Sequence, residues 1–132
     1  MKFCITILLA FLSSSITLAQ NPGMMVRIAE IEVHANHLEA YKTFLQEEAR
    51  ASVQLERGVI CIYPMFQKGA PTQVRILEIY ASREAYEAHL QTPHFQKYKT
   101  GTQQMVKSLK LVDMDALDPK TMALIFAKHG RK

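Results

Sequence analysis

The segment from Val74 to Tyr80 constrains the fold of this chain more than any other. It reads Val-Arg-Ile-Leu-Glu-Ile-Tyr, so Val74 and Ile76 fall on one face of the predicted strand while Leu77 and Ile79 fall on the other. An antiparallel sheet with water on one side normally alternates apolar and polar residues more cleanly than this. Both faces of the strand therefore need cover from other parts of the protein.

Strand-like and helix-like segments follow one another in the order β-α-β-β-α-β. We expect strands at Met25–Val33, Val59–Phe66, Val74–Tyr80 and Leu109–Met114, with helices after the first and third of them. This order is that of a ferredoxin-like α+β domain, in which helices cover one face of an antiparallel sheet. The sheet of a second subunit is the expected cover for the other face, so the sequence predicts a homodimer.

Side chains that begin and end helices support this order. Asn36, with a glutamate three residues later, is expected to cap the first helix, and Gly58 is expected to end it. Ser82 is expected to cap the second helix, and Thr92-Pro93 to break that helix and begin another. Residues 68–72 should form the turn of a hairpin between the second and third strands.

Residues 1–19 are typical of a secretory signal peptide. Lys2 supplies a positive charge, Ile5–Leu12 is an apolar run too short to span a bilayer, and Ala19 is a small residue at the expected cleavage point. We therefore expect export, to the periplasm or beyond, with no stable membrane insertion after cleavage. Cleavage would leave Cys61 as the only cysteine, in a strand where burial is expected.

The 132 residues suffice for one domain, expected at residues 25–114 and followed by an extension at residues 115–132. In the extension, Asp118-Pro119 should begin a short helix. The net charge of +4 is spread along the chain, with no basic run interleaved with aromatic residues. A nucleic-acid-binding surface is therefore not indicated.

Residues 78–95 bring a carboxylate, two phenols and two imidazoles together within a short stretch. Glu78 shares a strand face with apolar residues, where burial would raise its pKa and suit it to act as a base or to orient a histidine. Alternatively, it is a strand-end carboxylate bonded to an arginine or a helix cap. His89 could take a proton near neutral pH, or it could be a satisfied core or cap histidine.

His94 lies in the first turn of a helix, where the helix dipole favours a neutral imidazole, so it could donate a hydrogen bond or serve local structure only. Tyr80 is a second candidate donor. Four apolar or aromatic side chains could line a substrate pocket or could simply be core residues: Tyr63, Met65, Phe66 and Phe95. His34 could lie at the mouth of that pocket or on a surface loop. The spacing of His89 and His94 fits no common zinc motif, so no metal site is predicted.

Residues 25–114 resemble the antibiotic biosynthesis monooxygenase (ABM) domain, and within it the small bacterial quinol monooxygenases. The matching stretches are Arg27–Ile31, Tyr63–Met65, Glu78–Tyr80 and Ala88–Phe95, the last containing His-Leu-Gln-Thr-Pro-His. The resemblance implies a dimeric α+β barrel. It also implies oxidation of quinols or hydroxylated aromatics by O2 without metal, flavin or haem. The chain has no tryptophan, which disfavours haem degradation as in some relatives.

Three functions remain open on such a fold. The first is cofactor-independent monooxygenation of a quinol or hydroxylated aromatic, with His89 or Glu78 as the base and Tyr80 or His94 as the donor to the oxyanion. The second is isomerisation of a hydroxy-ketone by the same base, without O2. The third is a non-catalytic dimer that binds a small apolar ligand.

Overall fold

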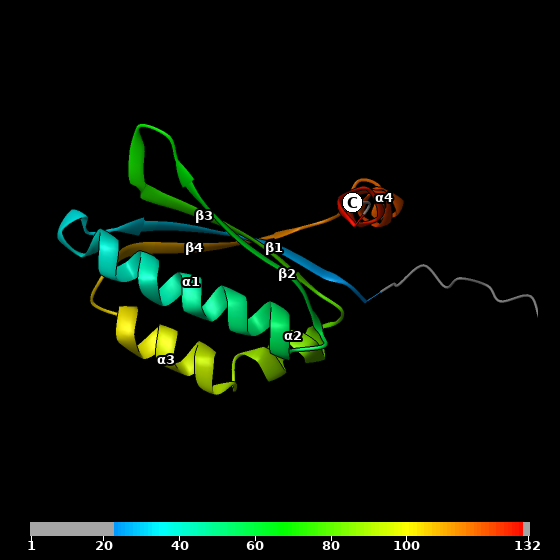
Figure 1. Ribbon diagram of the computed structural model, residues 1–132, viewed down its shortest axis with the longest axis horizontal. Helices are drawn as coiled ribbons and strands as arrows, with labels where there is room; N and C mark the ends of the chain where they lie inside the picture. Colours follow the sequence, from blue (N-terminus) through cyan, green and yellow to red (C-terminus); the bar gives the residue numbers. More distant parts are fainter. Residues whose placement is uncertain (1–22, 131–132) are drawn as a thin grey trace, which may run out of the picture.

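One antiparallel sheet with helices on one face forms the body of the protein. The computed structural model describes residues 23–130, so the signal peptide expected at residues 1–19 lies outside them. In chain order the elements are β1 Met25–Val33, the 3-10 turn η1 Ala35–His37, α1 Leu38–Leu55, β2 Val59–Gln67, β3 Ala70–Tyr80, α2 Arg83–His89, α3 Pro93–Thr102, β4 Val106–Met114 and α4 Pro119–His129. The strand order is β2-β3-β1-β4, and α1, α2 and α3 lie together on one side of the sheet (Figure 1). The predicted ferredoxin-like α+β class is confirmed.

The hairpin between β2 and β3 is tighter than expected. Its turn consists of Lys68 and Gly69 alone, and Gln67 already pairs with Ala70. Gly69 has a φ of +79°, a backbone conformation that a residue without a Cβ adopts at little cost. Pro71, which suggested a longer turn, lies inside β3 near this exposed end, so β3 begins four residues before the expected Val74.

Two of the expected helix signals act differently from the prediction. Asn36 lies within η1 and caps nothing, because α1 begins after His37, which makes no side-chain capping bond. The helix ends at Leu55, three residues before Gly58. Gly58 is needed for another reason: a Cβ built there would lie 2.6 Å from the Cβ of Ala85 in α2.

The other helix signals are confirmed. The Ser82 hydroxyl accepts a hydrogen bond from the Ala85 amide at the start of α2. The Thr92 hydroxyl accepts one from the Phe95 amide, and Pro93 occupies the first turn of α3. These caps fix where the short helix α2 stops and α3 begins, which places the two histidines of this segment close together.

The hydrophobic core lies between the sheet and the helix layer. From the strands it takes residues of a single face, including Ala29, Ile31 and Val33 of β1 and Val74 and Ile76 of β3. From α1 it takes side chains at helical spacing: Tyr41, Leu45 and Ala49. The strand faces predicted for β1 and β3 are therefore correct.

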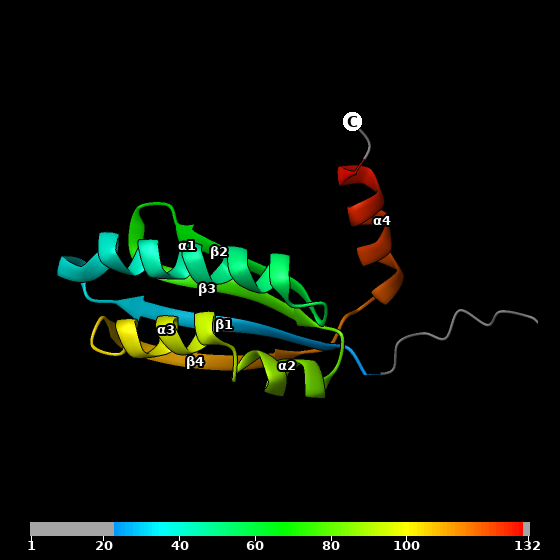
Figure 2. The same ribbon diagram turned by 60° about the horizontal axis from the view of Figure 1, so that its bottom comes forward.

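The opposite face of the sheet carries an apolar strip beside a polar part, where Glu30 pairs with Arg75 and Lys110. Ile28 pairs with Leu77, which pairs with Tyr63 on its other side, and paired residues of an antiparallel sheet share a face. Tyr63 is 59% exposed there, and Met65 is exposed as well. Helix α4 stands apart from α1–α3 beyond the end of β4 and does not cover this face (Figure 2). The homodimer expected from the two-sided strands stays a prediction.

Cys61 lies on the same face, half-buried, with its sulfur 3.8 Å from the Leu77 carbonyl oxygen. Burial raises the pKa of the thiol, which agrees with a structural role for this residue rather than a reactive one. Within residues 23–130, no helix combines the length and apolar character needed to cross a membrane.

Candidate functional site

A cavity of about 580 Å³ lies between the central strands and the helix layer. Its floor comes from all four strands, β2 giving only Ile62, and its roof from α1, α2 and α3. This volume is within the range of pockets that enclose small organic molecules. Most of the lining is apolar or aromatic, and its titratable side chains include Arg27, Glu48, Glu78, Tyr80 and His89.

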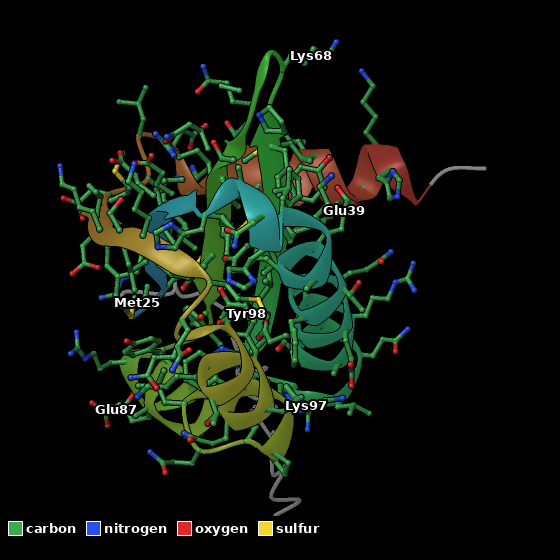
Figure 3. The ribbon with its side chains drawn as sticks, turned by 90° about the vertical axis from the view of Figure 1, so that its left-hand side faces the viewer. Met25, Glu39, Lys68, Glu87, Lys97 and Tyr98 are labelled. Carbon is green, nitrogen blue, oxygen red and sulfur yellow. The ribbon has the colours of Figure 1, made fainter. Side chains whose placement is uncertain are left out.

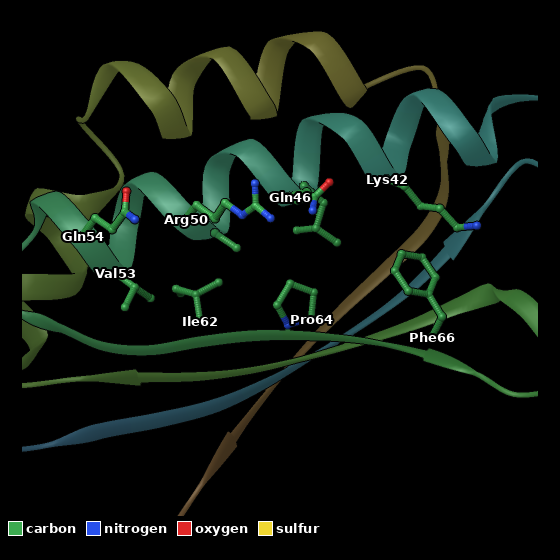
Figure 4. Close-up of a pocket in the computed structure, with 10 residues that line it drawn as sticks. Lys42, Gln46, Arg50, Val53, Gln54, Ile62, Pro64 and Phe66 are labelled. Atoms are coloured by element: carbon green, nitrogen blue, oxygen red, sulfur yellow. The ribbon is translucent and has the colours of Figure 1, made fainter. Parts of the chain in front are cut away.

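A second, shallower hollow of about 450 Å³ lies between α1 and β2 (Figure 4). Phe66 lines it, beneath the Lys42 ammonium group, which lies 5.5 Å from the ring centre. Its lining contains no histidine and no carboxylate. The groups that could move protons therefore face the first cavity, and Phe66 is not among the residues that line it.

Glu78 and Tyr80 form a bonded pair on the cavity floor. The Tyr80 hydroxyl donates to Glu78 Oε2 over 2.9 Å, and the Tyr80 side chain is almost fully buried. Burial raises the pKa of Glu78 above its ordinary value, while the bond from Tyr80 and the nearby charge of Arg27 act in the opposite direction. The pKa of Tyr80 is also raised, by burial and then by Glu78, so its phenol keeps its proton and acts as a donor.

Arg27 is a buried cation on the same floor. Its Nε donates to Asp113 of β4 over 2.7 Å, and its guanidinium lies 4.7 Å above the centre of the Tyr86 ring. The side chain of Arg27 is only 8% exposed. Because a guanidinium stays charged under all ordinary conditions, Arg27 places a permanent positive charge on the cavity floor, in addition to Lys99 in the lining, and this charge could balance an anionic ligand.

His89 lies at the end of α2, 2% exposed, with one carboxylate near each ring nitrogen. Its Nδ1 is 2.9 Å from Glu56 Oε1, and its Nε2 is 3.5 Å from Glu48 Oε1. The ring packs between aromatic neighbours, with centroid separations of 4.8 Å to Phe95 and 5.5 Å to Tyr80. These contacts hold the imidazole in a single orientation at the cavity wall.

Glu48 is a buried carboxylate on the helix side of the cavity. Ser52, one turn further along α1, donates to its Oε1 over 2.6 Å. Burial raises the pKa of Glu48, and the bond from Ser52 and the charge of His89 partly oppose this rise. The cavity thus has two carboxyl groups, Glu48 above and Glu78 below, whose environments favour the protonated form.

His94 does not line the cavity but lies behind His89. Its Nε2 is 2.5 Å from Glu56 Oε1, the same oxygen that Nδ1 of His89 contacts. Thr92 makes this arrangement possible, because its hydroxyl donates to the His89 carbonyl oxygen over 2.8 Å and turns the chain sharply into α3. The role expected for His94 as a donor to a bound oxyanion does not fit this position.

Glu56, His89 and His94 also form a group of potential metal ligands. Two ligands of a tetrahedral zinc ion lie about 3.3 Å apart, given zinc–nitrogen bonds of about 2.0 Å. The carboxylate oxygen here lies 2.9 Å and 2.5 Å from the two nitrogens. Such short separations are those of hydrogen bonds with a proton between the atoms, so the group fits shared protons better than a metal ion.

Several of the expected lining residues lie elsewhere. Tyr63 and Met65 project from the opposite face of the sheet, because β2 contains an irregularity between Val59 and Cys61 that shifts the alternation of its side chains. His34 is exposed at the beginning of α1, while His89 contacts Glu56 at the other end of this helix of 18 residues, about 27 Å long. Phe95 does line the cavity, as predicted.

Arg27, Glu48 and Glu56 were not predicted from the sequence as site residues. Arg27 falls on the strand face that carries Ala29 and Ile31, and a charged residue on an apolar face is a recognisable signal. Glu48 likewise falls on the apolar stripe of α1, seven residues after Tyr41. For Glu56 no such signal exists, because it follows the end of a helix and meets His89 only in the folded structure.

Two tyrosines, Tyr41 and Tyr98, are bonded to each other beside the cavity. Tyr98 points from α3 into the space between the helices and the sheet (Figure 3), and its hydroxyl lies 2.7 Å from that of Tyr41. Burial raises the pKa of Tyr41 to about 12, and that of Tyr98 also rises, so both remain protonated. Tyr98 lines the cavity while Tyr41 belongs to the core.

Comparison with known proteins identifies one family. The sequence profile described as "ABM: Antibiotic biosynthesis monooxygenase" matches residues 24–101, more than half of the chain. A crystal structure from Bacteroides thetaiotaomicron, named provisionally as such a monooxygenase, is 44% identical, covers 75% of this chain and 94% of its own, and has a TM-score of 0.74. No protein of established function in the curated collection matches.

More distant structures share the fold. A provisionally named monooxygenase from Lactobacillus acidophilus is 27% identical over 70% of this chain and 44% of its own, with a TM-score of 0.69. A protein from Nitrosomonas europaea, named provisionally as an antibiotic biosynthesis monooxygenase, is 24% identical over 74% of this chain and 94% of its own, with the same TM-score.

Proposed function

The chain belongs to the antibiotic biosynthesis monooxygenase family, and we propose that it oxidises a quinol or a hydroxylated aromatic with O2. The observation that carries this proposal is the cavity itself, where an imidazole and two buried carboxyl groups face a space lined mostly by apolar and aromatic side chains. Such a space suits a flat aromatic substrate with one or two hydroxyl groups.

The proposed chemistry needs a base and little else from the protein. Removal of the hydroxyl proton by His89 or Glu78 turns the substrate into an electron-rich anion, which can itself reduce O2. One oxygen atom becomes bonded to a ring carbon in place of hydrogen, and the other leaves as water. The substrate supplies all four electrons that reduce O2, so a quinol would leave as a hydroxylated quinone. A well-placed base contributes on the order of 10²–10⁴-fold in rate.

Arg27 supports the same proposal through charge. An anionic substrate brought into an apolar cavity loses its hydration, and a permanent cation on the floor offsets part of that cost. The single hydroxyl proton of Tyr80 is already donated to Glu78, whereas a guanidinium has five N–H groups and Arg27 uses its Nε for Asp113. We therefore assign the stabilisation of the oxyanion chiefly to Arg27 rather than to Tyr80. The apolar walls exclude water and hold the ring in place.

Oxygen uptake with menadiol tests the proposal. Wild type should consume O2 in step with menadiol, with no added cofactor and after treatment with a chelator, and His89→Ala should lose most of the activity. His129→Ala, on the separate helix α4, is the matched control and should behave as wild type. Equal rates in His89→Ala and wild type would contradict the role of His89. Turnover of a hydroxy-ketone without O2 would indicate an isomerase, and ligand binding without turnover a binding protein.

We further propose that two copies meet through the uncovered sheet face, and that the protein is exported. The support for the dimer is the apolar strip that includes Ile28, Tyr63 and Leu77. In analytical ultracentrifugation, Leu77→Asp should sediment as a monomer, whereas wild type and Leu124→Asp on α4 should sediment as dimers.

The support for export is the sequence of residues 1–19, and cell fractionation would test it.

A further inference from the structure

We propose that Glu56 fixes the tautomer of His89, with His94 holding Glu56 in place, so that the Nε2 lone pair of His89 is the base that faces the cavity. This inference rests on the proposed function for its catalytic part. Glu56 and His94 are positioning residues here, since they act through His89. The observation behind it is that one oxygen atom, Oε1 of Glu56, lies within hydrogen-bonding distance of a ring nitrogen of both His89 and His94.

The bonding leaves one arrangement of protons for a neutral His89. A neutral imidazole has a single N–H, and only a protonated nitrogen can donate to a carboxylate. The separation of 2.9 Å between Nδ1 and Glu56 is that of a hydrogen bond, whereas the 3.5 Å between Nε2 and Glu48 is too long for a strong one. The proton therefore lies on Nδ1, and Nε2 keeps its lone pair.

The two nitrogens also differ in what they face. Glu48, next to Nε2, lines the cavity, while Glu56, next to Nδ1, does not. The lone pair is thus on the side from which a substrate hydroxyl can approach. When Nε2 takes the proton of that hydroxyl, the oxygen–hydrogen bond of the substrate breaks and a nitrogen–hydrogen bond forms. The new imidazolium then lies beside the Glu56 carboxylate, which offsets its charge without moving.

His94 makes this arrangement rigid. The Glu56 side chain follows the end of α1 and belongs to no regular element, so a single bond to His89 would leave it free to rotate. The contact of 2.5 Å from His94 Nε2 provides a second anchor, from the first turn of α3. Three separate segments of the chain therefore meet at one carboxylate oxygen. A carboxylate that orients a histidine in this way works as the aspartate does in hydrolase triads.

Imidazole NMR tests the tautomer independently of any substrate. In full-length, ¹⁵N-labelled protein at neutral pH, the long-range ¹H–¹⁵N spectrum should show His89 protonated on Nδ1 and bare on Nε2, with the signals assigned by their loss in His89→Gln. Glu56→Gln should shift the population toward the Nε2–H form, because the amide nitrogen of glutamine can donate to Nδ1. His89 protonated on Nε2, or on both nitrogens, in the wild type would overturn the inference.

Kinetics tests the consequence for catalysis. Glu56→Gln should lower kcat for menadiol oxidation by on the order of 100-fold while KM changes less than about threefold, and Glu56→Asp should restore part of the loss. Glu47→Gln is the matched control, because Glu47 also links α1 to α3, through Lys97, but is exposed and does not line the cavity. Equal kcat in Glu56→Gln and wild type would overturn the inference. If wild type does not oxidise menadiol, the proposed function fails while the NMR result still decides the tautomer.

Discussion

Replacement of Gly58 by alanine should destabilise the protein although the backbone there is unstrained. The added Cβ would lie 2.6 Å from the Cβ of Ala85, well inside ordinary contact, and neither methyl group can rotate away. Overpacking of this kind costs about 1–3 kcal/mol. Reduced freedom of the unfolded chain returns about 0.4–1 kcal/mol. We therefore expect the free energy of unfolding to fall by about 1–2 kcal/mol, measured by equilibrium denaturation in urea.

A second glycine, Gly23, and the residue opposite Gly58 supply the controls. Gly23→Ala introduces a Cβ with no atom within 4 Å and should change the free energy of unfolding by less than about 0.5 kcal/mol. Ala85→Gly removes the opposing methyl group, so the double variant should lose less stability than the sum of the two single variants. If Gly58→Ala is as stable as wild type, or if the two losses simply add, the close approach of α2 to Gly58 is not what requires glycine.

Three other variants test separate parts of the structure. Tyr41→Phe removes one partner of the Tyr41–Tyr98 bond and should cost about 1–3 kcal/mol in urea unfolding, because the Tyr98 hydroxyl is left buried without it. Burial raises the Glu78 pKa in the folded state, so stability from this group is present below the unfolded pKa and is lost as pH rises through the raised value. Glu78→Gln should therefore gain stability relative to wild type as pH rises from about 4 to 8, and a constant difference would contradict this. Thr92→Ala should cost about 1 kcal/mol in thermal unfolding through loss of the α3 cap, and an unchanged melting temperature would show that the cap is not needed.

The sequence predicted the fold well because its signals are local. The alternation of Ala29, Ile31 and Val33 and the helical spacing of Tyr41 and Leu45 depend only on near neighbours in the chain. Errors arose where side-chain chemistry at a boundary was ambiguous. Asparagine commonly caps helices, but Asn36 lies in a 3-10 turn that the chain forms before α1.

The site could be predicted only in part, for a related reason. Glu78, Tyr80 and His89 were found because they lie close together in the chain, and all three do line the cavity. The partner of His89 is Glu56, 33 residues earlier, and no local pattern connects them. Tyr63 was expected in the pocket, but an irregularity between Val59 and Cys61 reverses the alternation of the residues that follow it and puts Tyr63 on the other face.

The positions of β2 and β4 at the two edges of the sheet affect how the protein meets copies of itself. An open edge strand can pair with another chain and so begin aggregation. Pro64 removes an amide donor from β2, the irregularity near Cys61 interrupts its regular hydrogen bonding, and β4 carries charges at Lys107 and Lys110. Each of these features hinders the addition of a further strand. The sheet is thereby protected at its edges against fibre-like growth, and the face with the apolar strip is the one through which we propose that two copies meet.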